Sequence, residues 1–137
     1  MNRAVATPGG TLVLDREGLA KAVLRDRGVT KWLELAREDD LRVVTSAATL
    51  VEVVHPGVRR PALDWVLSRI VVEPVTEEVA RRAAGLLADV GLHGHQHAID
   101  AMLAATALRA PSPVTVLTSD VDDLRTLCRS GVVVIKV

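Results

Sequence analysis

Aromatic residues are nearly absent from this sequence: its 137 residues include two Trp and no Phe or Tyr. A core must therefore be built from Val, Leu, Ile and Ala, and hydrophobic residues make up 49% of the chain, enough for a globular domain. The single cysteine, Cys128, excludes an internal disulfide framework and fits a reducing compartment. We therefore expect one domain, residues 11–137, and a cytoplasmic location.

Long apolar runs and net charge are also lacking. No run approaches the roughly 18 apolar residues of a membrane span, and the N-terminus lacks a signal-peptide apolar segment. We expect no membrane association. Basic and acidic residues number 17 each, so net charge gives no general attraction to nucleic acid. If a metal ion occupied four of the acids, 13 acidic residues (17 − 4) would remain against 17 basic residues, which leaves the surface a modest positive excess.

Short apolar runs alternate with segments of helical spacing along the chain. After a flexible lead-in over residues 1–10, the pattern predicts strands over 11–14, 41–45, 70–75, 114–117 and 132–137. It predicts helices over 17–26, 30–38, 47–55, 61–69, 77–90, 97–109 and 121–128. Apolar strands alternating with helices indicate an α/β fold whose parallel sheet is covered on both faces.

The ends of two helices carry recognisable signals. Ser46 is a suitable N-cap for the helix over 47–55, and Thr76 is one for the helix over 77–90, which Gly91 ends. We expect residues 92–96, LHGHQ, to form a loop before the helix over 97–109.

That last helix is apolar on nearly every side, yet it carries one carboxylate near its start, Asp100. An ionised Asp in such a setting is costly unless it is paired, near water or bound to a cation. Three more acids interrupt apolar segments: Asp15 after TLVL, Glu52 within AATLVEVV, and Asp120 after VTVLTS. Ligands of open α/β sheets bind beyond the carboxyl ends of the strands. We therefore expect the four acids to converge on one Mg²⁺ or Mn²⁺ site, because all-oxygen ligation suits these ions.

Each acid taken singly also has an explanation without metal. Asp15 can begin a turn, and Asp120 can cap the helix that follows it. Asp100, in a first helical turn, can complement the helix dipole. Glu52 can belong to a solvated stripe with Thr49 and His55, at helical spacing. The context that all four acids share favours the common site.

The segments around these acids resemble the PIN-domain ribonucleases, and most closely the VapC-like toxins of bacterial toxin–antitoxin pairs. The matching pieces are LVLD ending at Asp15, SAATLVEV with Glu52, AIDAMLAATAL with Asp100, and LTSDVDDL with Asp120. The third piece is the most specific, because an Asp followed by a small-residue helix ending in Ala-Thr-Ala is close to a family hallmark. The resemblance covers almost the whole chain from residue 11 to 137.

The resemblance implies a three-layer α/β/α fold, with a five-stranded parallel sheet in the order 3-2-1-4-5. It implies that the catalytic residues and metal ligands are Asp15, Glu52, Asp100 and Asp120, supported by Thr118 and Asp123. The implied activity is divalent-metal-dependent hydrolysis of RNA phosphodiester bonds, leaving a 5′-phosphate and a 3′-hydroxyl. The resemblance further implies a homodimer that a cognate antitoxin inhibits.

One departure from the family pattern follows the first acid. The family usually has Ser or Thr directly after its first Asp, whereas this chain has Arg16. Arg16 can contact an RNA phosphate, as can the pair Arg59 and Arg60, which is otherwise a solvated helix end. The alternative function is therefore a catalytically silent PIN module that acts by binding RNA or protein.

Two further features lie outside the matching pieces. His93, His95 and His97 precede the third acid, and such a run either binds a transition metal or forms a solvated or RNA-contacting edge. Trp32 and Trp65 lie on predicted helix faces, where they either pack into the core or line an antitoxin groove.

Overall fold

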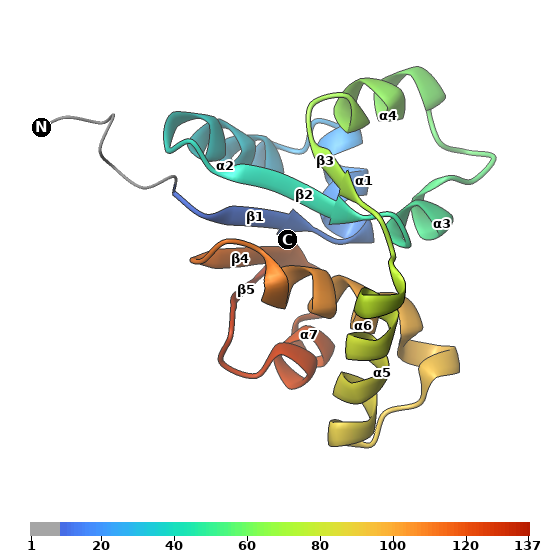
Figure 1. The fold of residues 1–137 in the computed structure, drawn as a ribbon. Coiled ribbons are helices and arrows are strands. Elements are labelled where there is room, and N and C mark those ends of the chain that lie inside the picture. The colour runs from blue at the N-terminus through green and yellow to red at the C-terminus, as the bar shows by residue number, and fades with distance from the viewer. Residues whose placement is uncertain (1–8) are drawn as a thin grey trace, which may run out of the picture.

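The computed structural model describes residues 9–137 and contains a five-stranded parallel sheet in the order β3-β2-β1-β4-β5 (Figure 1). The strands are β1 (Thr11–Leu14), β2 (Arg42–Ser46), β3 (Val71–Glu73), β4 (Val114–Thr118) and β5 (Val133–Lys136). The predicted fold class and strand order are confirmed. The predicted lead-in over residues 1–10 lies, up to residue 8, outside the described residues.

Helices cover both faces of the sheet and make it the middle of three layers (Figure 1). The first layer contains α1 (Arg16–Val23), α2 (Arg27–Glu38), α3 (Thr49–Val53) and α4 (Arg60–Leu67); the other contains α5 (Glu77–Val90), α6 (Gly94–Arg109) and α7 (Val121–Cys128). Strand side chains point alternately to the two layers. Leu12 and Leu14 of β1 pack in the first layer, while Val13 between them packs in the second.

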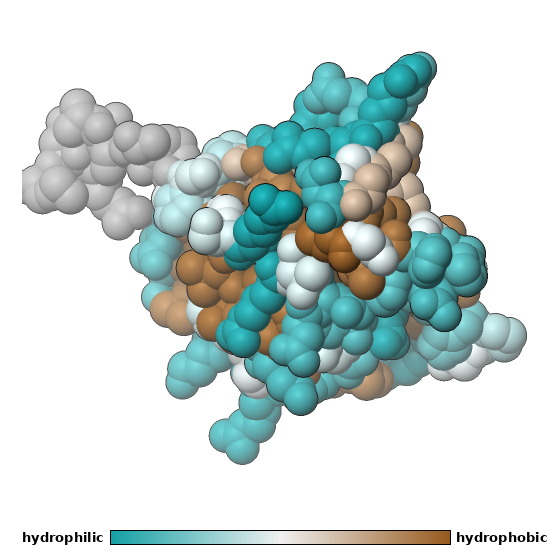
Figure 2. All heavy atoms as spheres, turned by 90° about the horizontal axis from the view of Figure 1, so that it is seen from below, coloured by the Kyte–Doolittle hydropathy of each residue, from teal (hydrophilic) through white to brown (hydrophobic). Residues whose placement is uncertain are grey.

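The outer faces of α5 and α7 are hydrophilic, as the periodicity of these helices predicts. Seen from that side in Figure 2, hydrophilic residues form most of the projecting surface and apolar residues appear in the recesses between them. Val79, Ala83 and Leu87 of α5 recur on one helical face and are buried in the core cluster that α5 shares with α6 and α7. Within residues 9–137, no helix is both long enough and apolar enough to cross a bilayer.

The cap residues of α5 act as predicted, but Ser46 does not start a helix. Thr76 accepts a hydrogen bond from the Val79 amide, and Gly91 ends α5 with a φ of 71°. Ser46 instead is the last residue of β2, and α3 begins only at Thr49. The reason is a long-range bond, because the Ala47 amide donates to the Glu73 carbonyl and holds the chain beside β3.

The helix that carries Asp100 begins earlier than predicted. Gly94 to Gln96 form its first turn, because the amides of Gln96 and His97 donate to the His93 carbonyl at 3.2 and 3.0 Å. The predicted loop over 92–96 is therefore wrong for its last three residues. Asp100 then lies at the seventh position of α6, beyond the first turn, where helix-dipole stabilisation falls away.

The carboxyl ends of β1 and β4 lie side by side. Leu14 is paired with Leu117, and the Asp15 amide donates to the Leu117 carbonyl at 3.1 Å. From β1 the chain continues to β2 on one side, whereas β4 lies on the other side. This reversal of strand order is the point at which open α/β sheets form their ligand crevice.

Candidate active site

Asp15 is held rigidly at this edge of the sheet. Its side chain is buried, and its two oxygens have different partners: Oδ1 accepts from the Gly18 amide at 2.9 Å, and Oδ2 accepts from the Thr118 hydroxyl at 2.5 Å. The first bond caps α1, so Asp15 has a local structural role, as an N-cap where the sequence suggested a turn. Burial raises the pKa of Asp15 above its usual 3.8, although the Thr118 hydroxyl and nearby amides oppose the rise. A buried carboxylate with fixed oxygens is thus available at the switch point.

Asp120 stands at the N-cap position of α7 but does not cap it. Its side chain makes no capping hydrogen bond, and its amide donates to the Thr118 hydroxyl oxygen at 2.8 Å. Thr118 therefore links Asp15 and Asp120 through one buried hydroxyl. The capping explanation for Asp120 is therefore wrong, and its carboxylate oxygens are not occupied by a helix cap.

Asp100 is the most perturbed acid of the group. Burial, followed by repulsion from Asp120, Asp15, Glu52 and Asp123, raises the pKa of Asp100 from 3.8 to about 7. Electrostatic repulsion decays with distance, so these contributions mean that the carboxylates lie near one another. All four predicted acids therefore meet in one region, although they come from four separate segments.

Glu52 faces this region from α3 and meets a cation there. The Arg16 Nε lies 3.7 Å from Glu52 Oε2, and the Arg16 Nη2 lies 4.0 Å from Asp120 Oδ2. Burial raises the pKa of Glu52, Arg16 lowers it, and Asp15 and Asp120 raise it. Arg16 thus stands between two of the acids. The alternative of a solvated stripe is wrong for Thr49, which is buried, whereas His55 is exposed.

The chemistry of these donors fits a hard divalent cation. The four predicted ligands offer carboxylate oxygens alone, which suit Mg²⁺ or Mn²⁺. Their mutual repulsion is what a cation would relieve, and Arg16 relieves it only in part from 3.7 and 4.0 Å. The metal-ligand and catalytic roles of these residues stay predictions.

A groove of about 490 Å³ adjoins the acids. Its lining includes Arg16, Glu52 and Arg59, so two guanidinium groups share a wall with one of the acids. Arg60, the first residue of α4, is exposed but does not line this groove. Asp123 lies on α7 close enough to Asp100 to raise its pKa, which agrees with a supporting position.

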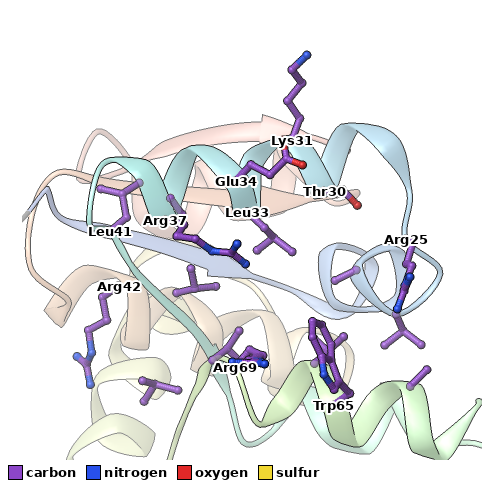
Figure 3. A pocket seen from close by; sticks show the side chains of 18 of the residues that line it. Arg25, Thr30, Lys31, Leu33, Glu34, Arg37, Leu41, Arg42, Trp65 and Arg69 are labelled. Carbon is purple, nitrogen blue, oxygen red and sulfur yellow. The ribbon is translucent and has the colours of Figure 1, made fainter.

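A second, larger groove of about 970 Å³ runs between α2, α4 and the β2–β3 edge (Figure 3). Trp65 of α4 and Arg69, two residues beyond the end of α4, point into it, and Arg37 reaches in from α2. Trp65 is 54% exposed with the Arg69 guanidinium 5.1 Å from its ring centre, so the core-packing explanation is wrong for this residue. Val23 lines both grooves, which makes them neighbours.

Thr45 was not singled out in the sequence, yet it helps to build the site. Its buried hydroxyl donates to the Leu14 carbonyl at 2.7 Å, one residue before Asp15. This bond fixes the end of β1 against β2. The available signal was a hydroxyl residue directly at the end of an apolar strand, but many such residues merely cap turns.

Residues 12–129 match the family described as PIN domain. No curated relative matches the sequence significantly. Among solved structures, the chain is similar to VapBC2 from Rickettsia felis bound to a DNA fragment from its promoter, with 16% identity and a TM-score of 0.70 over 93% of this chain and 98% of the other. It is also similar to FitAB bound to the IR36 DNA fragment, with 22% identity and a TM-score of 0.60 over 91% and 94% of the two chains. For FitAcB from Neisseria gonorrhoeae the identity is 22% and the TM-score 0.52, over 90% and 96%.

Proposed function

This chain belongs to the PIN-domain family, and from that premise we propose that it is a divalent-metal-dependent endoribonuclease and the toxin of a toxin–antitoxin pair. The observation that carries the proposal is the meeting of four acids from separate segments at the carboxyl edge of β1 and β4. A structural role does not require such crowding, because like charges in one place destabilise the fold.

We assign metal binding, positioning of the ligands and RNA binding to different residues. We assign the metal to Asp15, Glu52, Asp100 and Asp120, where a bound divalent cation supplies a water of lowered pKa and offsets charge on the leaving oxygen. Asp15 presents oxygens that Gly18 and Thr118 hold in place. Thr118 positions Asp120 as well, through the Asp120 amide. We assign RNA phosphate binding to the groove with Arg16 and Arg59.

Cleavage assays test this proposal directly. The purified chain should cleave RNA when Mg²⁺ or Mn²⁺ is added and stop when the ion is chelated. Asp100→Asn should remove cleavage and leave a folded protein, because the amide is isosteric but supplies no anionic ligand. Asp122→Asn is the matched control, since Asp122 is an exposed acid at the start of α7. Metal-independent cleavage, or full cleavage by Asp100→Asn, would contradict the assignment.

The larger groove supports an antitoxin as the protein partner. Six basic residues surround it, namely Arg25, Arg27, Lys31, Arg37, Arg42 and Arg69, against Glu34 and Asp40, and its wall includes the exposed Trp65 (Figure 3). Such a surface suits a peptide with apolar anchors and acidic residues. The similarity in fold to VapBC2 and FitAB agrees with this proposal. Copurification with a small DNA-binding protein from the adjacent reading frame tests it.

We also propose a homodimer in the cytoplasm, as the family resemblance implies. Light scattering of the purified chain measures its mass, and a monomer at micromolar concentration would contradict the dimer. Fractionation that places the chain in the membrane would contradict the location.

Arg16 favours a second candidate function, a catalytically silent PIN module that binds RNA or protein. Its guanidinium already lies between Glu52 and Asp120 and supplies positive charge to both. The two candidates separate in one experiment. A silent module binds RNA without cleaving it at any Mg²⁺ or Mn²⁺ concentration, and Arg16→Ser, which restores the usual family residue type, then recovers cleavage.

A further inference from the structure

The first two turns of α6 meet the start of α7 at three side chains of mixed chemistry. His97, Asp100 and Asp123 each offer one ligand atom, and these atoms all lie within 4.8 Å of one another. The three residues are partly buried. Of the histidine run, only His97 belongs to this group. His93 and His95 are exposed, and their rings pair with each other at a centroid distance of 5.8 Å.

The spacing of these atoms suits a shared ion better than a direct bond. His97 Nδ1 lies 3.6 Å from Asp123 Oδ2, which is too long for a hydrogen bond. Two atoms at that separation can both lie about 2.1 Å from one ion, the usual metal–nitrogen distance for zinc. His97 and Asp100 are three residues apart on α6, so their side chains lie on one helical face.

The donor set also indicates the class of ion. An imidazole nitrogen with two carboxylates suits first-row transition metals, whereas Mg²⁺ prefers oxygen ligands and retains its water. We propose that His97, Asp100 and Asp123 form a transition-metal site of the Zn²⁺ or Co²⁺ class, beside the four-acid site. The binding stands on the geometry of these three residues alone.

A consequence for activity rests on the proposed function. Asp100 belongs to both groups of residues, so an ion held by His97 and Asp123 takes Asp100 away from the four-acid group. Zn²⁺ should therefore inhibit Mg²⁺-dependent cleavage, and His97→Ala should relieve the inhibition.

Metal titrations of the whole chain test the site without RNA. In the metal-free protein, Co²⁺ binding is followed by its visible absorption, and Mg²⁺ binding by calorimetry. His97→Ala should weaken Co²⁺ binding at least about tenfold, the smallest loss expected for a residue of a metal site. It should leave Mg²⁺ binding unchanged, because Mg²⁺ does not use the imidazole. His95→Ala is the matched control, since His95 is an exposed histidine on the same helix outside the group.

A second pair of variants checks the ligand on α7. Asp123→Asn should weaken Co²⁺ binding as His97→Ala does, while Asp122→Asn should not. Circular dichroism establishes that each variant is folded. The proposal is overturned if His97→Ala binds Co²⁺ with the wild-type affinity and spectrum, or if His95→Ala weakens binding equally. If the chain binds Co²⁺ through His97 but never cleaves RNA, the result supports this site and contradicts the proposed function. If the chain cleaves RNA but does not bind Co²⁺ through His97, the result contradicts this site alone.

Discussion

Asp100→Asn should make the metal-free protein more stable at neutral and alkaline pH while it removes cleavage. The reason is the cost of ionising Asp100 in the folded state, where burial and repulsion from Asp120, Asp15 and Glu52 raise its pKa from 3.8 to about 7. An Asn of the same shape carries no charge, so it escapes this cost.

The sign of the pH dependence follows from proton linkage. Between pH 4 and 7 the folded protein holds a proton on Asp100 that the unfolded chain has released, so the free energy of unfolding falls as pH rises through this window. Below pH 4 both states are protonated, and above pH 7 the full penalty remains. Wild-type protein should therefore lose stability from pH 5 to pH 8, and Asp100→Asn should lose less.

The magnitude can be bounded from the same pKa. A rise from 3.8 to about 7 corresponds to at most about 4 kcal/mol at 1.36 kcal/mol for each pKa step. Asp100 is only partly buried, and neighbouring acids share the repulsion, so we expect a gain of about 1 to 2 kcal/mol for Asp100→Asn at pH 8.

Urea unfolding in the presence of EDTA at pH 5 and pH 8 measures this difference. Asp122→Asn is the control, because Asp122 is exposed and should show the wild-type pH dependence. Saturating Mn²⁺ should reverse the order at pH 8, since the ion stabilises only a protein that binds it. The reasoning is refuted if Asp100→Asn is no more stable than wild type at pH 8, or gains equally at both pH values.

Three other substitutions probe the surrounding structure. Thr118→Val should lower the free energy of unfolding by about 1 to 3 kcal/mol, because it leaves the buried Asp15 oxygen without its hydroxyl partner, whereas Thr118→Ser should retain both stability and cleavage. Arg16→Ala should raise Mn²⁺ affinity about fivefold at pH 8, because Arg16 competes with the ion for the carboxylates, and two unit charges about 4 Å apart attract by about 1 kcal/mol in water. Calorimetry measures the affinity, and weaker binding would show that Arg16 helps the site. Trp65→Ala should change stability by under about 0.5 kcal/mol but abolish copurification with the antitoxin, while Val133→Ala, at an exposed residue of β5, should change neither.

Local signals in the sequence predicted the elements well where the stabilising contacts are also local. Thr76 and Gly91 bound α5 as predicted, because a cap needs only amides and carbonyls within one turn. The order of the five strands also agreed with the prediction that the family resemblance implied. The continuous apolar run over residues 11–14 predicted a buried strand, and Leu12, Val13 and Leu14 are indeed fully buried in β1.

Contacts between distant segments explain the errors. Ser46 has the right residue type for an N-cap, but pairing of Ala47 with Glu73 keeps the chain in the sheet. Trp65 has an apolar ring, yet the fold leaves it 54% exposed in a groove that no local pattern describes. From the sequence, Arg16 was a candidate to contact an RNA phosphate, and only the tertiary structure places it beside Glu52 and Asp120.

The sequence by itself determined that four acids end or interrupt apolar segments, because hydrophobic periodicity depends only on the order of the residues along the chain. Only the tertiary structure decided that Thr118 bonds Asp15 across 103 residues and that the other three carboxylates raise the pKa of Asp100. The physical reason is that charge repulsion and hydrogen bonding depend on distance in space, which the chain fixes only when the sheet assembles.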